Sequence, residues 1–235
     1  MSSAWPEIVR AVAARYRSRT HRGFVAGKLR HDPVYAALFA DPELEAARSV
    51  VDLGCGRGIL LALLAERARR SGDALQLHGI ENRTAHAEVA RAALGADGRI
   101  EAGDVITSAI PPAEAICLID VLHYLPETAQ FPLLERVARA LPPGGVLYVR
   151  EIDRVAGLRG WLARSAEHMM SALRGEPARV FAFRSARRWR QLLAEAGLRV
   201  EERPMDEGTP FANVLLVGRR GGQETRPAAI LPTSQ

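Results

Sequence analysis

The sequence predicts an α/β protein in which seven short strands alternate with helices and form a doubly wound, mostly parallel sheet with helices on both faces. Residues 49–53 form an apolar run with one acid, which breaks into glycines and is followed at once by apolar residues at helical spacing. Further apolar runs follow later helical segments, an order typical of β-α-β units. The run 115–119 carries no charge, as expected of a central strand covered on both faces.

Strands and helices take turns from residue 49 onward. Strands are expected at 49–53, 75–81, 98–101, 115–120, 146–149, 198–203 and 211–218. Helices are expected at 59–70, 82–94, 127–140 and 185–196, where apolar residues recur every three or four positions. Glycines close three of these helices, as they commonly do: Gly72, Gly95 and Gly197.

Residues 1–48 are predicted to form an N-terminal helical extension. A first helix is expected at 4–19. A basic and aromatic stretch follows, which Gly23 and Gly27 are expected to break. Two Asp-Pro pairs are typical of helix starts, with the aspartate as cap and the proline in the first turn: Asp32-Pro33 and Asp41-Pro42.

The glycine-rich turn 52–58 (Asp-Leu-Gly-Cys-Gly-Arg-Gly) lies at the carboxyl end of the first strand, where open α/β sheets bind ligands. Glycines let a ligand approach the backbone, and the start of the next helix presents unpaired N–H groups. Asp52 favours a cationic ligand, because a carboxylate here repels a pyrophosphate. A nicotinamide or flavin site is also disfavoured, since Ile59 stands where the dinucleotide fingerprint needs Gly or Ala.

This turn resembles the cofactor motif of the class I S-adenosylmethionine-dependent methyltransferases, which have a seven-stranded, Rossmann-like fold. The resemblance extends from about Ser49 to about Gly218, so the methyltransferase domain is predicted at 49–219 and residues 1–48 lie outside the general pattern. It implies that the cofactor is S-adenosylmethionine, which carries a sulfonium and an ammonium and no phosphate. It also implies that the last two strands form an antiparallel hairpin.

The resemblance places cofactor contacts at the carboxyl ends of successive strands. Glu81 ends the second strand, where a carboxylate can accept hydrogen bonds from both hydroxyls of a ribose. Asp104 is expected to accept from the adenine amine, with the backbone of Val105 pairing to the ring; an Asx turn is the alternative for Asp104. The expected cofactor residues are Lys28, Asp52, Gly54, Cys55, Gly56, Gly58, Glu81, Asn82, Asp104, Val105 and Asp120.

Polar residues after the fourth and fifth strands are candidates for the chemistry. His123 is expected beside the transferable methyl group, where an imidazole could deprotonate or orient a substrate hydroxyl or amine. Tyr124 could line the same wall. The stretch 150–153 is expected to leave the fifth strand on the ligand side, which makes Glu151 a further candidate base. A purely structural role stays open for each of these residues.

Two helical segments are expected to contact the substrate. In related methyltransferases an N-terminal extension commonly forms a lid over the cofactor. Residues 155–175 are predicted to form a helical insertion that caps the substrate pocket or packs on the core, and residues 220–235 a disordered tail. The expected substrate residues are Tyr16, His21, Phe24, His123, Trp161 and His168.

Composition limits the remaining possibilities. With 235 residues and 48% hydrophobic content, the chain can form one α/β domain with an extension. The net charge is +5, and arginine carries nearly all the positive charge because Lys28 is the sole lysine. The two cysteines do not indicate a disulfide scaffold. No apolar run is long enough to cross a bilayer. A cytoplasmic location is therefore expected. No spacing is typical of a metal site, and no metal is predicted.

The acceptor is expected to be a small aromatic or acyl-type molecule of a biosynthetic pathway. An acidic carrier protein could present it to the basic surface. Nucleic acid is disfavoured, because residues 120–123 (Asp-Val-Leu-His) replace the Asn/Asp-Pro-Pro-aromatic motif of methyltransferases that act on base amines, and no basic run is interleaved with several aromatics. An RNA or protein methyltransferase and a non-catalytic binding subunit remain alternatives. The oligomeric state is left open.

Overall fold

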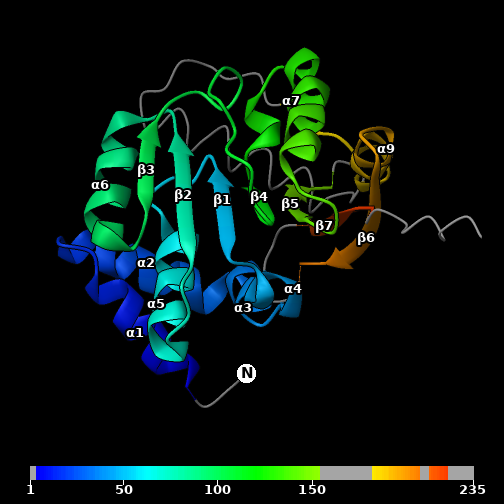
Figure 1. Cartoon of the computed structure of the whole chain (residues 1–235). Helices are drawn as coiled ribbons and strands as arrows, with labels where there is room; N and C mark the ends of the chain where they lie inside the picture. The colour runs from blue at the N-terminus through cyan, green and yellow to red at the C-terminus, as the bar shows by residue number, and fades with distance from the viewer. Residues whose placement is uncertain (1–3, 154–181, 207–211, 222–235) are drawn as a thin grey trace, which may run out of the picture.

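The computed structural model describes residues 4–153, 182–206 and 212–221 (Figure 1). The helices in these ranges are α1 (Trp5–Ala14), α2 (Arg19–His31), α3 (Pro33–Phe39), α4 (Pro42–Ala46), α5 (Ile59–Ser71), α6 (Thr84–Leu94), α7 (Glu127–Ala140) and α9 (Ala186–Glu195). The strands are β1 (Ser49–Leu53), β2 (Gln76–Glu81), β3 (Arg99–Ala102), β4 (Ala115–Ile119), β5 (Val146–Ile152), β6 (Leu198–Pro204) and β7 (Asn213–Arg220). The predicted insertion at 155–175 lies outside the described residues, as do residues 222–235 of the tail predicted at 220–235. Arg220, the first residue of that predicted tail, instead ends β7, where it pairs with Leu198 of β6.

The strands form a seven-stranded sheet in the order β3-β2-β1-β4-β5-β7-β6. β7 runs antiparallel to β5 and β6, and the remaining pairs are parallel, which confirms the predicted α/β fold and its terminal hairpin. The strand order reverses between β1 and β4. The loops that leave these two strands therefore diverge at the carboxyl edge of the sheet and open a crevice there, the usual ligand site of such folds.

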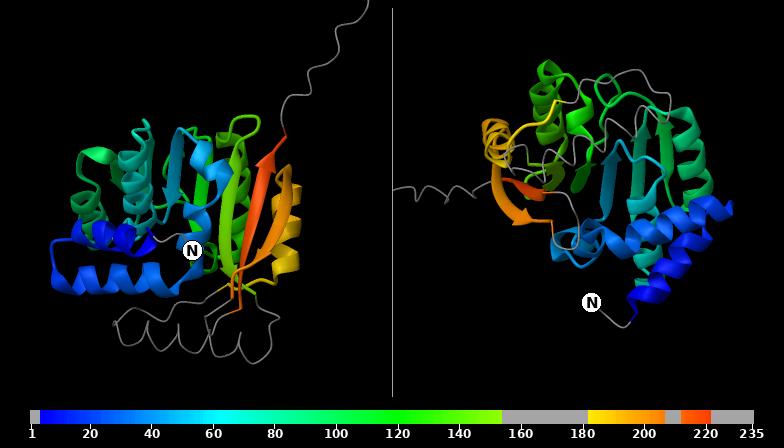
Figure 2. Two further views of the ribbon diagram at one scale, coloured as in Figure 1. Left: turned by 90° about the horizontal axis from the view of Figure 1, so that it is seen from below. Right: turned by 180° about the vertical axis from the view of Figure 1, so that it is seen from behind.

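Helices cover both faces of the sheet (Figure 2). Alternate strand residues point to opposite faces, so that Val51 and Leu53 of β1 join a core with α7 and α9, whereas Val50 joins a core with α3 to α6. Each face therefore has its own apolar cluster. No helix among the described residues is both long enough and apolar enough to span a bilayer.

The N-terminal extension packs on α5 through a third apolar cluster, to which Val12, Val25 and Leu29 contribute. The first helix ends at Ala14, and α2 starts after Ser18, whose hydroxyl accepts from the amide of His21. α2 runs straight through Gly23 and Gly27, so the prediction that these glycines break the segment was wrong. Burial of Val25 and Leu29 outweighs the weak helix propensity of glycine.

Both predicted Asp-Pro helix starts are confirmed, and both aspartates also tie the extension to the sheet. Asp32 caps α3 and Asp41 caps α4. The side chains of β5 that point to this face reach them: Tyr148 donates to Asp41 over 2.5 Å, and Arg150 donates to Asp32 over 2.5 Å. The extension is thus joined to the central sheet by buried polar contacts as well as by apolar packing.

β5 is longer than expected. The sequence predicts its end at Val149, but the strand continues to Ile152, which pairs with Asn213 of β7. Arg150 and Glu151 therefore lie inside a buried strand, although two charged residues in succession are typical of a loop. Pairing with β7 explains the difference, since it satisfies the backbone of the additional residues.

Candidate active site

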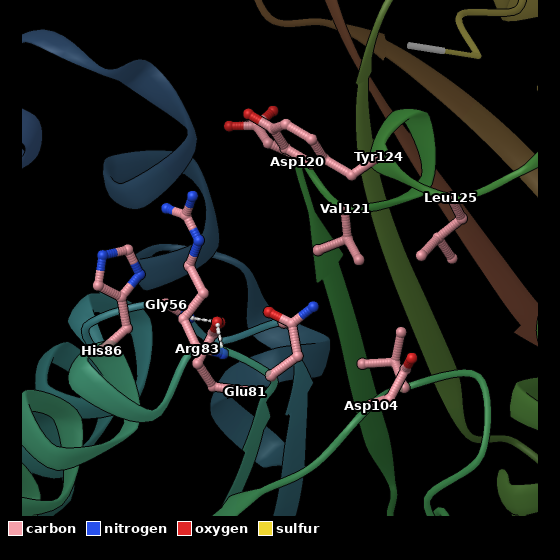
Figure 3. Close-up of a pocket in the computed structure, with 12 residues that line it drawn as sticks. Gly56, Glu81, Arg83, His86, Asp104, Asp120, Val121, Tyr124 and Leu125 are labelled. Atoms are coloured by element: carbon pink, nitrogen blue, oxygen red, sulfur yellow. Dashed lines mark hydrogen bonds between the residues drawn. The ribbon is translucent and has the colours of Figure 1, made fainter. Parts of the chain in front are cut away.

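Two adjoining cavities lie at the carboxyl edge of the sheet. The larger, of about 230 Å³, is bounded by the glycine turn, the end of β2, the start of α6 and the loop after β4 (Figure 3). The smaller, of about 150 Å³, lies between the glycine turn and helices α2 and α3. They share four lining residues, which mark the junction between them: Gly54, Gly56, His86 and Asp120.

The glycine turn adopts a backbone that other residues rarely adopt. Gly54 has a φ of 72° and Gly56 a φ of 56°, both in the left-handed region. A Cβ on Gly54 would lie only 2.7 Å from Cγ2 of Val121, whereas a Cβ on Gly56 would meet no atom within 4 Å. The first glycine therefore lets the turn pack against the loop after β4, and the second leaves open space for a ligand.

Glu81 is buried at the carboxyl end of β2, as the resemblance implied. Its Oε2 accepts from the amide of Gly56 and its Oε1 from the amide of Arg83, both over 2.8 Å (Figure 3). The two bonds fix the carboxylate between the glycine turn and the start of α6. Since a carboxylate has about four acceptor positions, the remaining ones can take the hydroxyls of a ribose.

Asp52 lines the smaller cavity and is 4% exposed. No described residue donates a hydrogen bond to its carboxylate. Burial, and then the negative charge of Glu81, raise the pKa of Asp52 to about 8. A buried carboxylate without a donor is unfavourable alone and is stabilised by a cation, so this cavity fits the ammonium and sulfonium of S-adenosylmethionine.

Asp104 and Val105 line the far end of the larger cavity, together with Asn82. Oδ1 of Asp104 accepts from the amide of Ile106 over 2.9 Å, which is the Asx turn considered as the alternative reading of this residue. Among the described residues nothing donates to Oδ2. The Asx turn and the expected adenine contact are therefore compatible roles of Asp104, because one oxygen shapes the turn and the other remains available to a ligand.

Asp120, the first residue after β4, lines both cavities. It has a φ of 58° and is the sole non-glycine residue with a positive φ in the described part of the chain. Arg150 pairs with both of its carboxylate oxygens. Burial alone would raise the pKa of Asp120, but the facing guanidinium lowers it below its usual value, so this carboxylate is ionised at neutral pH.

Comparison with known proteins agrees with this geometry. A family model described as a methyltransferase domain matches residues 21–203, which is most of the chain. The chain belongs to this methyltransferase family. The predicted family is thereby confirmed. The match begins early enough to include most of α2 and all of α3 and α4 of the extension, which the sequence motif alone left outside.

Two curated proteins are similar to part of this chain. The carboxy-S-adenosyl-L-methionine synthase of Pseudomonas syringae pv. tomato is 31% identical over 127 residues, 50% of this chain and 49% of that protein. The trans-aconitate 2-methyltransferase of Methylobacterium radiotolerans is 36% identical over 148 residues, 61% of this chain and 54% of that protein. The chain thus spans about half the length of these relatives.

Among solved structures, an O-methyltransferase family protein from Burkholderia thailandensis shares the fold of this chain. The TM-score is 0.65 at 21% identity, and the match covers 94% of this chain and 68% of that chain. Identity at this level supports the architecture, including the N-terminal helices, and does not extend to the substrate.

His123 and Glu151 lie behind the wall of the larger cavity. His123 is 1% exposed and stacks on Phe183, and neither residue lines either cavity. Glu151 is 0% exposed, which corrects the expectation that it leaves β5 on the ligand side. The fully buried Glu151 supports the loop after β4. Tyr124 does line the larger cavity, as predicted, and its ring points toward Asp120 (Figure 3).

The candidates from the extension separate into two groups. Phe24, which is 43% exposed, and Lys28 both line the smaller cavity, and the guanidinium of Arg57 lies 4.8 Å from the centre of the Phe24 ring. Tyr16 and His21 line neither cavity. Trp161 and His168 lie outside the described residues.

Tyr16 is corrected from a substrate contact to a support of the glycine turn. It is buried, and its hydroxyl donates to the backbone carbonyl of Arg57 over 3.0 Å. Cys55, by contrast, does line the smaller cavity. Its thiol is buried, and burial followed by the charges of Asp52 and Glu81 raises its pKa well above the usual range, so it remains a neutral packing group.

Sequence reasoning missed three features of the candidate site. Arg83 and His86 line the larger cavity from the start of α6, two and five positions after Glu81. This spacing was a usable signal, since both residues follow the acidic strand end. The third feature, the pairing of Arg150 with Asp120, depends on the unexpected length of β5 and left no local pattern in the sequence.

Proposed function

We propose that this methyltransferase binds S-adenosylmethionine across both cavities and transfers its methyl group to a small-molecule acceptor. One observation carries the proposal: two buried carboxylates with different surroundings lie at adjoining cavities. Glu81 is fixed by two amides and suits neutral hydroxyls, whereas Asp52 has no donor among the described residues and suits a cation. A ligand with a ribose at one end and a cationic amino acid at the other satisfies both.

The other residues that line the two cavities support this placement of the cofactor. The adenosine half belongs in the larger cavity, which Asp104 and Val105 line and where they can meet the adenine edge. The amino-acid half belongs in the smaller cavity, where Asp52 can accept from an ammonium and Lys28 supplies positive charge for a carboxylate. The sulfur then lies near the junction, which Asp120 lines from the loop after β4.

The work left to the protein is mainly alignment. Bound S-adenosylmethionine supplies a methyl group already activated by a positively charged sulfur. The chain holds donor and acceptor in line and excludes water, and orientation of this kind can contribute roughly 7–11 kcal/mol to the lowering of a barrier. Tyr124, on the wall of the larger cavity, is a candidate to contact the acceptor. We keep His123 as a positioning residue of that wall, because its ring is buried behind it.

For the acceptor we propose a small acyl-type or aromatic molecule of a biosynthetic pathway. The name of one curated relative supports this class, since trans-aconitate is a small carboxylic acid. The positive net charge of the chain favours an anionic acceptor, either free or on an acidic carrier protein. A cytoplasmic location is part of the same proposal.

Two measurements test the proposed function. Calorimetry of the wild-type chain with S-adenosylmethionine and with S-adenosylhomocysteine should register binding of both. Release of S-adenosylhomocysteine is then followed with carboxylic acids, phenols, acyl carrier conjugates and RNA as acceptors, and turnover is expected with one of the first three. Turnover with RNA alone would overturn the acceptor class. Absence of cofactor binding would favour the non-catalytic subunit. Formation of a carboxylated cofactor with no release of S-adenosylhomocysteine would indicate a reaction other than methyl transfer.

A further inference from the structure

A chain of charged side chains runs from the N-terminal extension to the junction of the two cavities. Asp32, which caps α3, accepts from Nη1 of Arg150 over 2.5 Å. Nε of the same guanidinium donates to Oδ1 of Asp120 over 2.8 Å, and Nη2 pairs with Oδ2. The side chain of Arg150 is only 4% exposed, so these contacts are largely shielded from solvent. Arg150 therefore joins two carboxylates from distant parts of the chain.

Asp120 has the backbone conformation that most needs support. Its φ of 58° is unfavourable for a residue with a Cβ, and a conformation of this kind persists where surrounding contacts impose it. Arg150 supplies such contacts to both parts of the residue. Its carbonyl accepts from the amide of Asp120 over 3.0 Å, while its guanidinium holds the carboxylate.

The conformation of Asp120 determines where the following loop runs. Residues 121–125 supply Val121, Tyr124 and Leu125 to the wall of the larger cavity. Val121 in turn packs so closely on the glycine turn that a Cβ on Gly54 would lie 2.7 Å from it. A different φ at Asp120 would redirect this loop and change the cavity at the place where the donor and acceptor halves meet.

We propose that Arg150 is a positioning residue of the donor site: anchored on Asp32, it holds Asp120 in the left-handed conformation that directs the loop 121–125 against the cofactor cavity. The proposal rests on the proposed function of the two cavities. It assigns Arg150 no contact with the reacting atoms, since Arg150 lines neither cavity. Asp32 extends the linkage into the N-terminal extension, where Lys28 lies 3.2 Å from its Oδ2.

The experiment is a double-mutant cycle between Arg150→Met and Asp120→Gly, with cofactor dissociation constants as the readout. Glycine adopts a positive φ without support, so it should remove the need for Arg150. We expect Arg150→Met alone to weaken binding of S-adenosylmethionine and S-adenosylhomocysteine by about tenfold or more, but by less than about threefold in the Asp120→Gly background, because coupled residues do not add. Equal losses in both backgrounds, or no loss, would overturn the proposal.

Further variants distinguish a loss of binding from misfolding of the chain. Arg150→Lys keeps the charge but cannot bridge both carboxylates with a planar fork, so an intermediate loss is expected. Arg188→Met is the matched control, because Arg188 pairs with Glu195 on an exposed part of α9 and its loss should leave binding unchanged. A purely structural role of Arg150 would lower the unfolding midpoint of Arg150→Met and leave the dissociation constants unchanged at a temperature where the variant is folded.

A crystal structure of Arg150→Met, or of Arg150→Lys if the first does not fold, decides the proposal without any ligand. A negative φ at Asp120 supports it, and a retained positive φ overturns it. This readout separates the proposal from the proposed function. If the wild-type chain fails to bind S-adenosylmethionine, the function of the cavities is refuted, while the φ of Asp120 in the variant still reports whether Arg150 imposes it.

Discussion

Nδ1 of His123 lies 2.7 Å from Oε2 of Glu151, and both side chains are buried between β5 and the loop after β4. The other oxygen of Glu151 accepts from the amide of Leu122 over 2.7 Å. Arg150, the preceding residue of β5, points to the opposite face of the sheet and holds Asp120. Two successive residues of one strand thus fix the same loop from both faces.

Removal of the Glu151 carboxylate should destabilise the fold. Glu151→Ala leaves the amide of Leu122 and the ring of His123 without their acceptor in a buried setting, and we expect the free energy of unfolding to fall by about 2–4 kcal/mol. Glu151→Gln, whose amide can still accept from Leu122, should lose less than half as much. Urea unfolding curves measure both variants. Equal stability of the alanine variant and the wild type would show that the pair contributes nothing.

Loss of the carboxylate at the end of β2 should weaken cofactor binding. Glu81→Ala removes the proposed acceptor for ribose hydroxyls and releases the amide of Gly56, so we expect the affinity for S-adenosylhomocysteine to fall by about 1–3 kcal/mol. Glu88→Ala, on the exposed side of α6, is the matched control. Titration calorimetry compares the two. Unchanged affinity in Glu81→Ala would remove this residue from the site.

The two glycines of the turn should respond differently to alanine. Gly54→Ala introduces both an unfavourable φ and a Cβ 2.7 Å from Val121, whereas Gly56→Ala introduces the unfavourable φ alone. We expect the first to lower the free energy of unfolding by about 2–4 kcal/mol and the second by about 1–2 kcal/mol. Thermal and urea unfolding without ligand test this order. The reverse order would mean that Val121 moves away at little cost.

Features within one strand–turn–helix unit could be predicted from the sequence. The glycine turn and the position of Glu81 belong to this class, because each lies at a strand end that the apolar pattern marks. Arg150 and Asp32 were beyond such reasoning. They meet across 118 positions of sequence, and Arg150 lies inside a strand because it pairs with both β4 and β7. The burial of Tyr16 could not be predicted for a similar reason, since it comes from the packing of the extension on α5.

Two glycines inside α2 predict a stabilising change. Gly23 and Gly27 lie inside α2, and a Cβ at either position would meet no atom within 4 Å. Alanine at these positions should raise the free energy of unfolding by about 0.5–1 kcal/mol each, because it has the higher helix propensity and restricts the unfolded chain. Urea unfolding of the single and double variants tests additivity. A loss of stability would indicate that the helix tolerates only glycine there.

The titration of Asp52 should make stability depend on pH. In the folded chain burial and Glu81 raise its pKa to about 8, whereas in the unfolded chain a carboxyl group titrates near about 3.9. Between these values the unfolded chain loses a proton that the folded chain keeps, so folding becomes less favourable as the pH rises. The stability gained in Asp52→Asn over the wild type should therefore grow from about pH 4 to about pH 8 and then level off. A pH-independent difference would contradict the raised pKa.

The same carboxylate should release its proton when a cationic ligand binds. Near about pH 6.5 the apoprotein holds Asp52 mostly protonated, and a bound ammonium or sulfonium favours the ionised form, so association should expel a proton from the wild type and none from Asp52→Asn. Calorimetry with S-adenosylmethionine in two buffers of different ionisation enthalpy measures the proton count directly. Equal proton counts for the two proteins would mean that the bound cation lies away from Asp52. The Asp52 carboxylate would then lack a partner in the complex, because no described residue donates to it.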